Sequence, residues 1–252
     1  MNQSKTIKKL AIITGSSGGI GSAICSKLFK ENYDVIGIDL FQSNQSKKIS
    51  FIKFNLENLT SENLESEEFI ELLISKIGKR KIDLLVNNAA IQIKDNLNDF
   101  NLNNWKKTIA INLEAPLILI EKLKNKFNVN GVVVNMSSIH AVLTKKNFLS
   151  YSVSKSALSS LTRALAVNYG NKLRFIGIQP AAIQTEMLEK GFGRGFKNKI
   201  RALKEAHPSE YIGDAFEVAE LVNAVASKDL KFLNGSIINI DGGISSRLHD
   251  PE

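Results

Sequence analysis

Cysteine, proline and aromatic residues are scarce in this sequence of 252 residues. One cysteine, Cys25, excludes an internal disulfide framework and any multi-cysteine zinc site. No apolar run approaches the roughly 18–20 residues needed to cross a membrane, so we expect no membrane partner. The apolar stretch Leu10–Ile13 is too short for a signal peptide, which leads us to expect a cytoplasmic protein.

Acidic residues are fewer than basic ones, 25 against 33, which gives a net charge of +8. Such a surplus attracts nucleic acid, anionic lipid or acidic metabolites. The basic residues are spread along the chain without a block of five or six, which favours no nucleic-acid partner. The composition is 43% hydrophobic and 23% charged, as in globular proteins, and excludes disordered and collagen-like chains. No repeat or Pro/Gly linker divides the chain, so we expect one domain over 1–252.

Short apolar segments alternate with helical patterns almost from end to end. The apolar segments are rich in Val, Ile and Leu, as in strands buried on both faces of a parallel sheet. This alternation predicts an α/β fold, a three-layer Rossmann-like doubly wound parallel sheet of about seven strands. We expect strands at Lys9–Ile13, Asp34–Asp39, Ser50–Asn55, Ile82–Asn87, Gly131–Met136, Leu173–Gln179 and Ser236–Ile240. We expect helices at Gly21–Glu31, Ser61–Ile77, Asn103–Phe127, Tyr151–Tyr169 and Ala215–Ala226.

A glycine-rich stretch, residues 14–21 (TGSSGGIG), joins the first strand to the first helix. Its glycines allow backbone N–H groups to approach a pyrophosphate, and the helix N-terminus adds roughly half a positive charge. Gly21 allows the helix to pack closely on the strand. A tight turn without a ligand is the alternative. The position between strand and helix favours a phosphate site.

The spacing of these glycines resembles the short-chain dehydrogenase/reductase family, whose pattern is T-G-x-x-x-G-I-G. Further resemblances follow in order over roughly residues 8–243: Asn87-Asn88-Ala89-Ala90, Asn112, Ser137-Ser138, Tyr151 to Lys155 (Y-x-x-x-K), Asn234-Gly235 and Asp241-Gly242-Gly243. The resemblance implies an oxidoreductase that uses a nicotinamide cofactor.

The end of the second predicted strand bears on the choice of cofactor. Asp39 there can accept hydrogen bonds from the adenosine ribose hydroxyls, and its charge repels a 2′-phosphate. We therefore predict NAD(H) over NADP(H), although Lys47 and Lys48 in the following segment keep the second cofactor open.

The resemblance implies further cofactor contacts. Asn55 stands where many relatives carry an Asp that receives the adenine amino group, and Ala90 replaces a usual glycine. Ile183 and Thr185 resemble the residues that hold the nicotinamide carboxamide. The full predicted cofactor set is Gly15, Ser17, Gly19, Ile20, Gly21, Asp39, Asn55, Leu56, Asn88, Ala89, Ala90, Tyr151, Lys155, Pro180, Ile183 and Thr185.

Four residues are predicted to be catalytic. Tyr151 and Lys155 are four apart in a helical pattern, which puts both on one face. A nearby ammonium and an oxidised nicotinamide would lower the tyrosine pKa from about 10, so that it exchanges a proton with the substrate. Ser138 would polarise the substrate oxygen. Asn112 would hold, through a water, the proton relay behind Lys155.

Specificity is expected from the residues around this centre. We predict substrate contacts from Gln92, His140, Phe148 and Gln184, and a lid over about 186–212, which reads as an irregular, glycine-bearing segment with basic residues. The three histidines form no metal-ligand pattern, so no metal is predicted.

The leading hypothesis is an NAD(H)-dependent oxidoreductase that interconverts a secondary alcohol and a carbonyl, with a sugar, polyol or hydroxy acid as its small-molecule substrate. Alternatives are a 3-oxoacyl-carrier-protein reductase and a non-catalytic nucleotide-sensing binding protein. Relatives are commonly tetramers built through the two long helices, which implies a homotetramer or a homodimer.

Overall fold

The sheet is the centre of the molecule. A computed structural model describes residues 8–43, 49–61, 63–192 and 196–248. Seven parallel strands form one sheet in the order β3-β2-β1-β4-β5-β6-β7. Their bounds are β1 Lys9–Thr14, β2 Tyr33–Asp39, β3 Ser50–Lys53, β4 Ile82–Asn87, β5 Phe127–Met136, β6 Leu173–Pro180 and β7 Ile237–Ile240.

The strand order reverses between β1 and β4. From β1 the chain builds outward to β3, then returns to the other side of β1 and builds outward to β7. In such sheets ligands bind in the crevice at the carboxyl ends of the strands, where the order reverses. The predicted doubly wound α/β fold is confirmed, and the fold places the glycine-rich stretch after β1 at this crevice.

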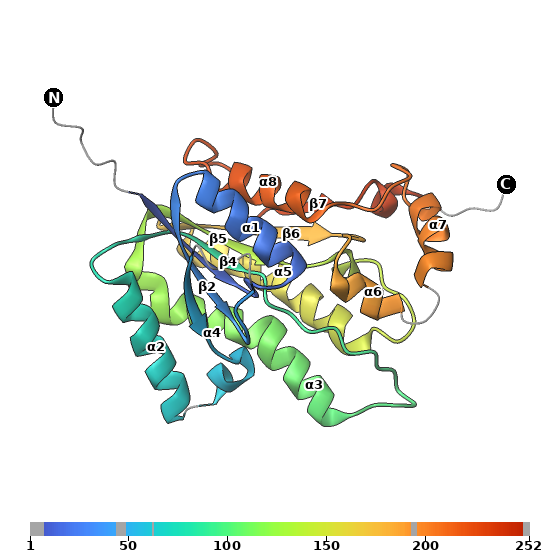
Figure 1. The fold of residues 1–252 in the computed structure, drawn as a ribbon, viewed down its shortest axis with the longest axis horizontal. Coiled ribbons are helices and arrows are strands. Elements are labelled where there is room, and N and C mark those ends of the chain that lie inside the picture. Colours follow the sequence, from blue (N-terminus) through green and yellow to red (C-terminus); the bar gives the residue numbers. More distant parts are fainter. Residues whose placement is uncertain (1–7, 44–48, 62, 193–195, 249–252) are drawn as a thin grey trace.

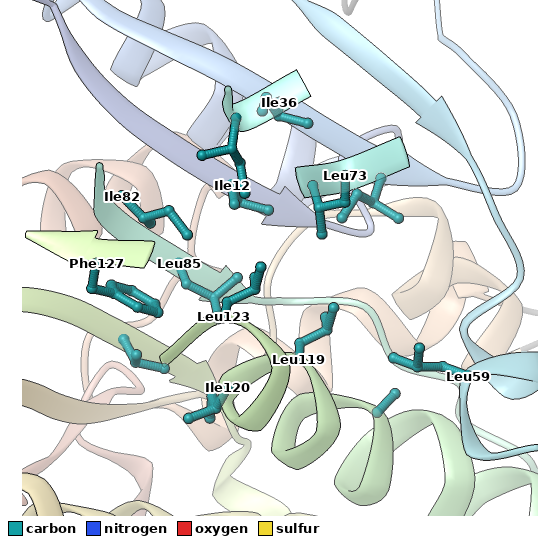
Figure 2. Packing of buried hydrophobic residues seen from close by; sticks show 14 of the residues in the cluster. Ile12, Ile36, Leu59, Leu73, Ile82, Leu85, Leu119, Ile120, Leu123 and Phe127 are labelled. Atoms are coloured by element: carbon teal, nitrogen blue, oxygen red, sulfur yellow. The ribbon is translucent and has the colours of Figure 1, made fainter. Parts of the chain in front are cut away.

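Helices cover both faces of the sheet (Figure 1). One face packs against α1 (Gly19–Lys30) and α8 (Ala215–Val225). The other packs against α2 (Leu64–Ile77), α4 (Ala115–Leu123) and α5 (Leu149–Tyr169). Figure 2 shows part of the second core, in which Leu119 and Leu123 of α4 meet strand residues such as Leu85. Because a fully buried leucine contributes roughly 1.5–3 kcal/mol, these faces hold the layers together.

The predicted helix over 103–127 is wrong as a single element. It divides into α3 (Leu102–Ile109), a wider π turn (Ala110–Glu114), α4 and a 3₁₀ turn (Lys124–Lys126). Pro116 at the start of α4 explains the break, because it has no N–H to give to the Asn112 carbonyl four residues earlier. The fifth strand also starts earlier than expected, at Phe127.

The segment over 186–212 is helical rather than irregular. It contains α6 (Glu186–Phe192) and α7 (Phe196–Ala206), which lie to one side of the sheet (Figure 1). Ion pairs one turn apart support both helices: Lys190 with Glu186 at 2.6 Å and Arg201 with Glu205 at 2.7 Å. Arg194 and two of the predicted lid glycines lie outside the described residues, as do Lys47 and Lys48.

Other boundaries move by a few residues, two of them for a clear local reason. The second helix starts at Leu64 rather than Ser61, since the Asn63 side chain accepts the Ser66 N–H and caps it. The third strand stops at Lys53 because Asn55 begins a 3₁₀ turn over Leu56–Thr60. None of the helices in the described ranges is long and apolar enough to span a membrane.

Candidate active site

The loop after β1 needs glycine at two positions. Gly15 has φ +65°, a conformation that L side chains rarely adopt, and its N–H donates to the Ile38 carbonyl at 2.8 Å. A Cβ on Gly21 would lie 1.9 Å from the Gly15 carbonyl oxygen. The loop therefore folds back onto the first turn of α1 and keeps the start of that helix close to β1.

The start of α1 fits an anionic ligand. Gly18 caps the helix without a side-chain hydrogen bond, and no acidic residue lies in the first turn. A Cβ on Gly18 would meet nothing closer than 3.5 Å, so its outer side is open. The N–H groups of this turn are available to a phosphate, which the helix dipole also favours.

Thr14 joins the two halves of the sheet and was not predicted as a site residue. Its hydroxyl accepts the N–H groups of Asn88 and Ala89, each at 3.0 Å. The Asn88 amide donates in return to the Thr14 and Gly15 carbonyls, at 3.0 and 3.1 Å. Asn88 therefore fixes the glycine loop against the end of β4, and the threonine before the first glycine was the available sequence signal.

Asp39 lies at the edge of the glycine loop, as predicted from its place at the end of β2. Its carboxylate accepts the Ser17 N–H at 2.8 Å and the Leu40 N–H at 2.7 Å. Asn55 uses its amide oxygen to accept the Glu57 N–H at 3.1 Å, and the Leu56 side chain is buried in the core. Among these predicted cofactor residues, Asp39 and Ser17 are joined by a direct hydrogen bond.

The last residues of the predicted cofactor set, Ile183 and Thr185, lie close to the start of α1. A Cβ on Gly19 would lie 2.6 Å from the Thr185 methyl group, so residues far apart in sequence are in contact here. Thr185 also caps α6 through a 3.4 Å bond from the Leu188 N–H. Ile183 is buried in the core against which Ile20 packs. Pro180 ends β6, and Ala90 is half-buried after β4.

The predicted catalytic side chains come together where β5 ends and α5 begins. Tyr151 is 7% exposed and Lys155 is 2% exposed. The Lys155 ammonium lies 5.7 Å from the centre of the Tyr151 ring and donates to the Met136 carbonyl at 2.7 Å. Ser138, two residues beyond β5, is within hydrogen-bond reach of the Tyr151 hydroxyl.

Burial sets the pKa values of this pair. It lowers the pKa of Lys155 from 10.5 to about 7, because the ammonium has lost its water. Burial also raises the pKa of Tyr151, and the hydrogen bond with Ser138 opposes that shift. The predicted lowering of the tyrosine pKa requires a charged Lys155, and burial disfavours that charge.

Asn112 lies in the π turn between α3 and α4 and is fully buried. Its amide oxygen accepts the Ile91 N–H at 2.9 Å, and its amide nitrogen donates to the Ile91 carbonyl and to Ser154. Ser154 adjoins Lys155 on α5. The side chain thus anchors the segment after β4 to α5, and Pro116 leaves the Asn112 carbonyl without its usual helical donor.

Sequence reasoning missed a group of polar residues behind Lys155. The Ser137 hydroxyl donates to the Lys155 carbonyl at 2.9 Å and lies 2.7 Å from the Ser159 hydroxyl. Gln179 of β6 donates to Ser159 at 3.1 Å. This buried network joins α5 to β5 and β6. The sequence sign that could have revealed it is Ser159, which lies one helical turn beyond Lys155.

Asp95 is a second residue that was missed. It is 3% exposed, and its carboxylate accepts the N–H of Ser150, at 3.1 and 3.2 Å for the two oxygens, and the Ser150 hydroxyl. Phe148, the residue before α5, offers no side-chain cap of its own. Asp95 therefore caps the helix that carries Tyr151 from a different part of the chain.

Aromatic rings line one side of Tyr151, which we call the substrate side because two of the predicted substrate residues, His140 and Phe148, lie there. His140 stacks on Phe148 at 4.6 Å between centroids and meets Tyr151 edge-on at 5.7 Å. Burial, and then the charge of Lys145, lower the pKa of His140 to about 4, so this ring is neutral at physiological pH. These two predicted substrate residues are thus beside Tyr151, whereas Gln184 is exposed at the segment leading into α6.

The helix α6, residues 186–192, lies close to the predicted substrate residue Gln92 and to Lys145. The Gln92 amide oxygen lies 3.5 Å from the position of a Cβ on Gly191 in α6. The Lys145 ammonium lies 5.0 Å from the centre of the Phe192 ring at the end of the same helix. In the described part of the chain, no three His, Cys, Asp or Glu residues group as metal ligands would.

Comparison with known proteins identifies the family. The family model described as enoyl-(acyl carrier protein) reductase, which belongs to the short-chain dehydrogenase/reductase family, matches residues 15–245. The chain therefore belongs to the short-chain dehydrogenase/reductase family and is an oxidoreductase of that family.

Relatives match nearly the whole chain. Glucose 1-dehydrogenase 2 of Bacillus subtilis is 29% identical over 94% of this chain and 95% of its own. The 3-oxoacyl-[acyl-carrier-protein] reductase of Buchnera aphidicola is 28% identical over 94% of this chain and 97% of its own. The solved ligand-free aldohexose dehydrogenase of Thermoplasma acidophilum has a TM-score of 0.87 at 29% identity, over 97% and 98% of the two chains.

Solved relatives hold both forms of the cofactor. A 4-hydroxyisoleucine dehydrogenase with NADH has a TM-score of 0.83 at 25% identity, over 96% and 100% of the two chains. A blue fluorescent protein from a metagenomic library with NADPH has a TM-score of 0.81 at 25% identity, over 94% and 98%. The family binds a nicotinamide cofactor of either kind.

Proposed function

We propose that this protein is an NAD(H)-dependent oxidoreductase that interconverts a secondary alcohol and a carbonyl. The observation that carries the proposal is the buried group of Tyr151, Ser138 and Lys155, which lies at the carboxyl ends of the strands, where the uncapped start of α1 also lies. The residues around the start of α1 fit a dinucleotide. The glycine loop, the N–H groups of the first helical turn and the Asp39 carboxylate lie next to one another there.

The chain's own residues manage the proton of the reaction. A bound nicotinamide supplies the hydride acceptor or donor. An alcohol becomes a carbonyl when its carbon loses a hydride and its oxygen loses a proton. Tyr151 takes that proton at its phenolic oxygen, and Ser138 holds the substrate oxygen by a hydrogen bond. Lys155, charged when a partner offsets its burial, stabilises the phenolate.

Asp39 supports NAD(H) over NADP(H). Its carboxylate already accepts the Ser17 N–H, so the loop presents a negative charge where a 2′-phosphate would lie. We expect Asp39→Ser to shift the ratio of kcat/KM for NADP to that for NAD upward by at least about tenfold, because repulsion is removed and the Ser17 N–H is freed. Steady-state kinetics with both cofactors measure the ratio.

The same kinetics can overturn the cofactor assignment. A wild-type preference of about tenfold or more for NADP would contradict it, as would an unchanged ratio in Asp39→Ser. Asp99→Ser is the matched control, because Asp99 is an exposed loop residue that bonds Asn96.

Sugars, polyols and hydroxy acids are the proposed substrates. Support comes from the polar side chains beside Tyr151, such as His140, and from the similarity to a glucose and an aldohexose dehydrogenase. We also propose that α6 is part of a lid, since Gly191 approaches Gln92 and Phe192 approaches Lys145.

A cofactor-linked screen tests the function. The purified protein is incubated with NAD and a panel of sugars, polyols and hydroxy acids, and NADH formation is followed by absorbance. Turnover of at least one compound, abolished in Tyr151→Phe, is expected. Reduction of a 3-oxoacyl-carrier-protein substrate alone would favour the carrier-protein reductase. NADH binding with no turnover of any compound would favour a nucleotide-sensing protein.

A further inference from the structure

Two lysines lie at the substrate side of Tyr151 without an acidic partner. Lys145 and Lys94 form none of the ion pairs found among the described residues. Partial burial, and then the charge of the nearby Lys94, lower the pKa of Lys145. Two like charges held together cost free energy unless an anion joins them.

Backbone pairing holds the two lysines near each other. The Asp95 N–H donates to the Asn147 carbonyl at 3.2 Å, and Asp95 pairs with Phe148 in an isolated parallel bridge. The Asn96 amide donates to the Asn147 side chain at 2.8 Å. The segment that carries Lys94 is thus joined to the segment that carries Lys145, and the Asp95 carboxylate, which would neutralise a lysine, is used inward on Ser150.

The aromatic wall connects Lys145 to the reacting centre. Its ammonium lies 4.7 Å from the centre of the Phe148 ring, and that ring lies 6.3 Å from the centre of the Tyr151 ring. His140 lies against both rings and is neutral at physiological pH, so it supplies no charge. Positive charge on this side of Tyr151 therefore comes from the lysines.

Two basic residues of the neighbouring helices, Lys190 and Arg201, have acidic partners instead. Lys190 in α6 and Arg201 in α7 each bond a glutamate one turn away and are highly exposed, at 74% and 88% of their side-chain surface. Those residues stabilise their own helices, weakly, as exposed pairs do. Lys145 instead lies over Phe148 and Phe192, between the aromatic wall and the end of α6.

We propose that Lys145 and Lys94 bind the anionic group, a carboxylate or a phosphate, of a substrate whose reacting carbon lies at Tyr151. The substrate is then a hydroxy acid or a phosphorylated sugar or polyol. This inference rests on the proposed function, because it names the substrate class of the same site. Lys145 also contacts Phe192, so binding of the anion is coupled to the position of α6.

Binding to the full-length protein saturated with NADH tests the proposal without turnover. Calorimetry compares two matched pairs: 3-hydroxybutyrate against 1,3-butanediol, and glucose 6-phosphate against glucose. We expect the anion of at least one pair to bind about tenfold more tightly than its neutral partner, and added salt to weaken that binding. The pair that responds distinguishes a carboxylate from a phosphate.

Variants assign the effect to the lysines. Lys145→Gln is expected to weaken binding of the preferred anion about five- to tenfold and Lys94→Gln somewhat less, with the neutral partner changed less than about twofold. Lys30→Gln, at the exposed end of α1, removes the same charge far from the site and is expected to change neither. Binding of NADH alone shows that each variant is folded.

Three results would overturn the proposal: neither anion binds, both pairs bind alike, or Lys145→Gln weakens anion and neutral partner equally. The turnover screen with NAD is scored separately. Anion binding without NADH formation from any compound would count against the proposed function, whereas turnover of neutral alcohols alone would count against the lysine site.

Discussion

The proposed proton-transfer centre and the proposed substrate side of Tyr151 are built in different ways. Asn112, Ser138 and Lys155 are buried, and each makes hydrogen bonds to backbone or to buried side chains. On the substrate side, Gln184 and Lys145 are exposed, and ring contacts prevail over hydrogen bonds. Buried, fully bonded groups tolerate little change, so the chemistry is fixed by the fold. Exposed contacts can vary, and we infer that specificity resides there.

The largest effect expected from this comparison comes from one oxygen atom. Tyr151→Phe removes the proton-exchanging group but leaves the packing of the ring, so kcat should fall by about a hundred- to ten-thousandfold. NADH binding, measured by fluorescence, should remain nearly intact. Tyr169→Phe at the other end of α5 is the control and should keep full activity. A Tyr151→Phe variant with more than about a tenth of the wild-type rate would contradict the proton-donor role.

A smaller effect concerns the stability of the cofactor-free protein. The unfolded chain holds the Lys155 proton up to about pH 10.5, whereas the folded chain releases it near pH 7. Between these values the unfolded chain binds more protons, so stability rises with pH by up to about 1.4 kcal/mol per pH unit. Urea denaturation at pH 7.5 and 8.5 should show a rise that Lys155→Met lacks. Equal slopes in the two proteins would contradict the lowered pKa.

An effect of similar size tests the link between the two regions. Asp95→Ala removes the cap of α5, so the free energy of unfolding should fall by about 1–2 kcal/mol. The kcat should fall more than KM changes, since the helix start positions Tyr151. Asp95→Asn keeps an accepting oxygen and should restore most of both values, and Asp99→Ala in the exposed neighbouring loop should be neutral. Failure of the asparagine variant to rescue kcat would show that Asp95 does not act as a cap.

The sequence predicted the buried parts of the molecule well. Apolar strands such as β4 and the glycine loop carry patterns set by local geometry, so the sheet, its order of elements and the place of Asp39 followed from them. The π turn at Asn112 was not predicted because the apolar pattern continues through it, and Pro116 was the single local sign.

Contacts between distant segments were beyond the sequence. Asp95 and Ser150 lie 55 residues apart, and nothing near either residue indicates the other. The contact of Gly19 with Thr185 likewise depends on the whole fold. The basic residues of 186–212 were visible in the sequence, but the pairing of Lys190 and Arg201 with glutamates on their own helices was not. Lys94 and Lys145, which form no ion pair among the described residues, lie outside that segment.

A crystal structure with NADH bound tests the central claim most directly. The account predicts that the reducible ring faces Tyr151, with the phenolic oxygen within about 5 Å of it, so that one substrate can touch both. A ring more than about 8 Å from that oxygen in every subunit would contradict the account, because no substrate could then exchange a hydride and a proton at once.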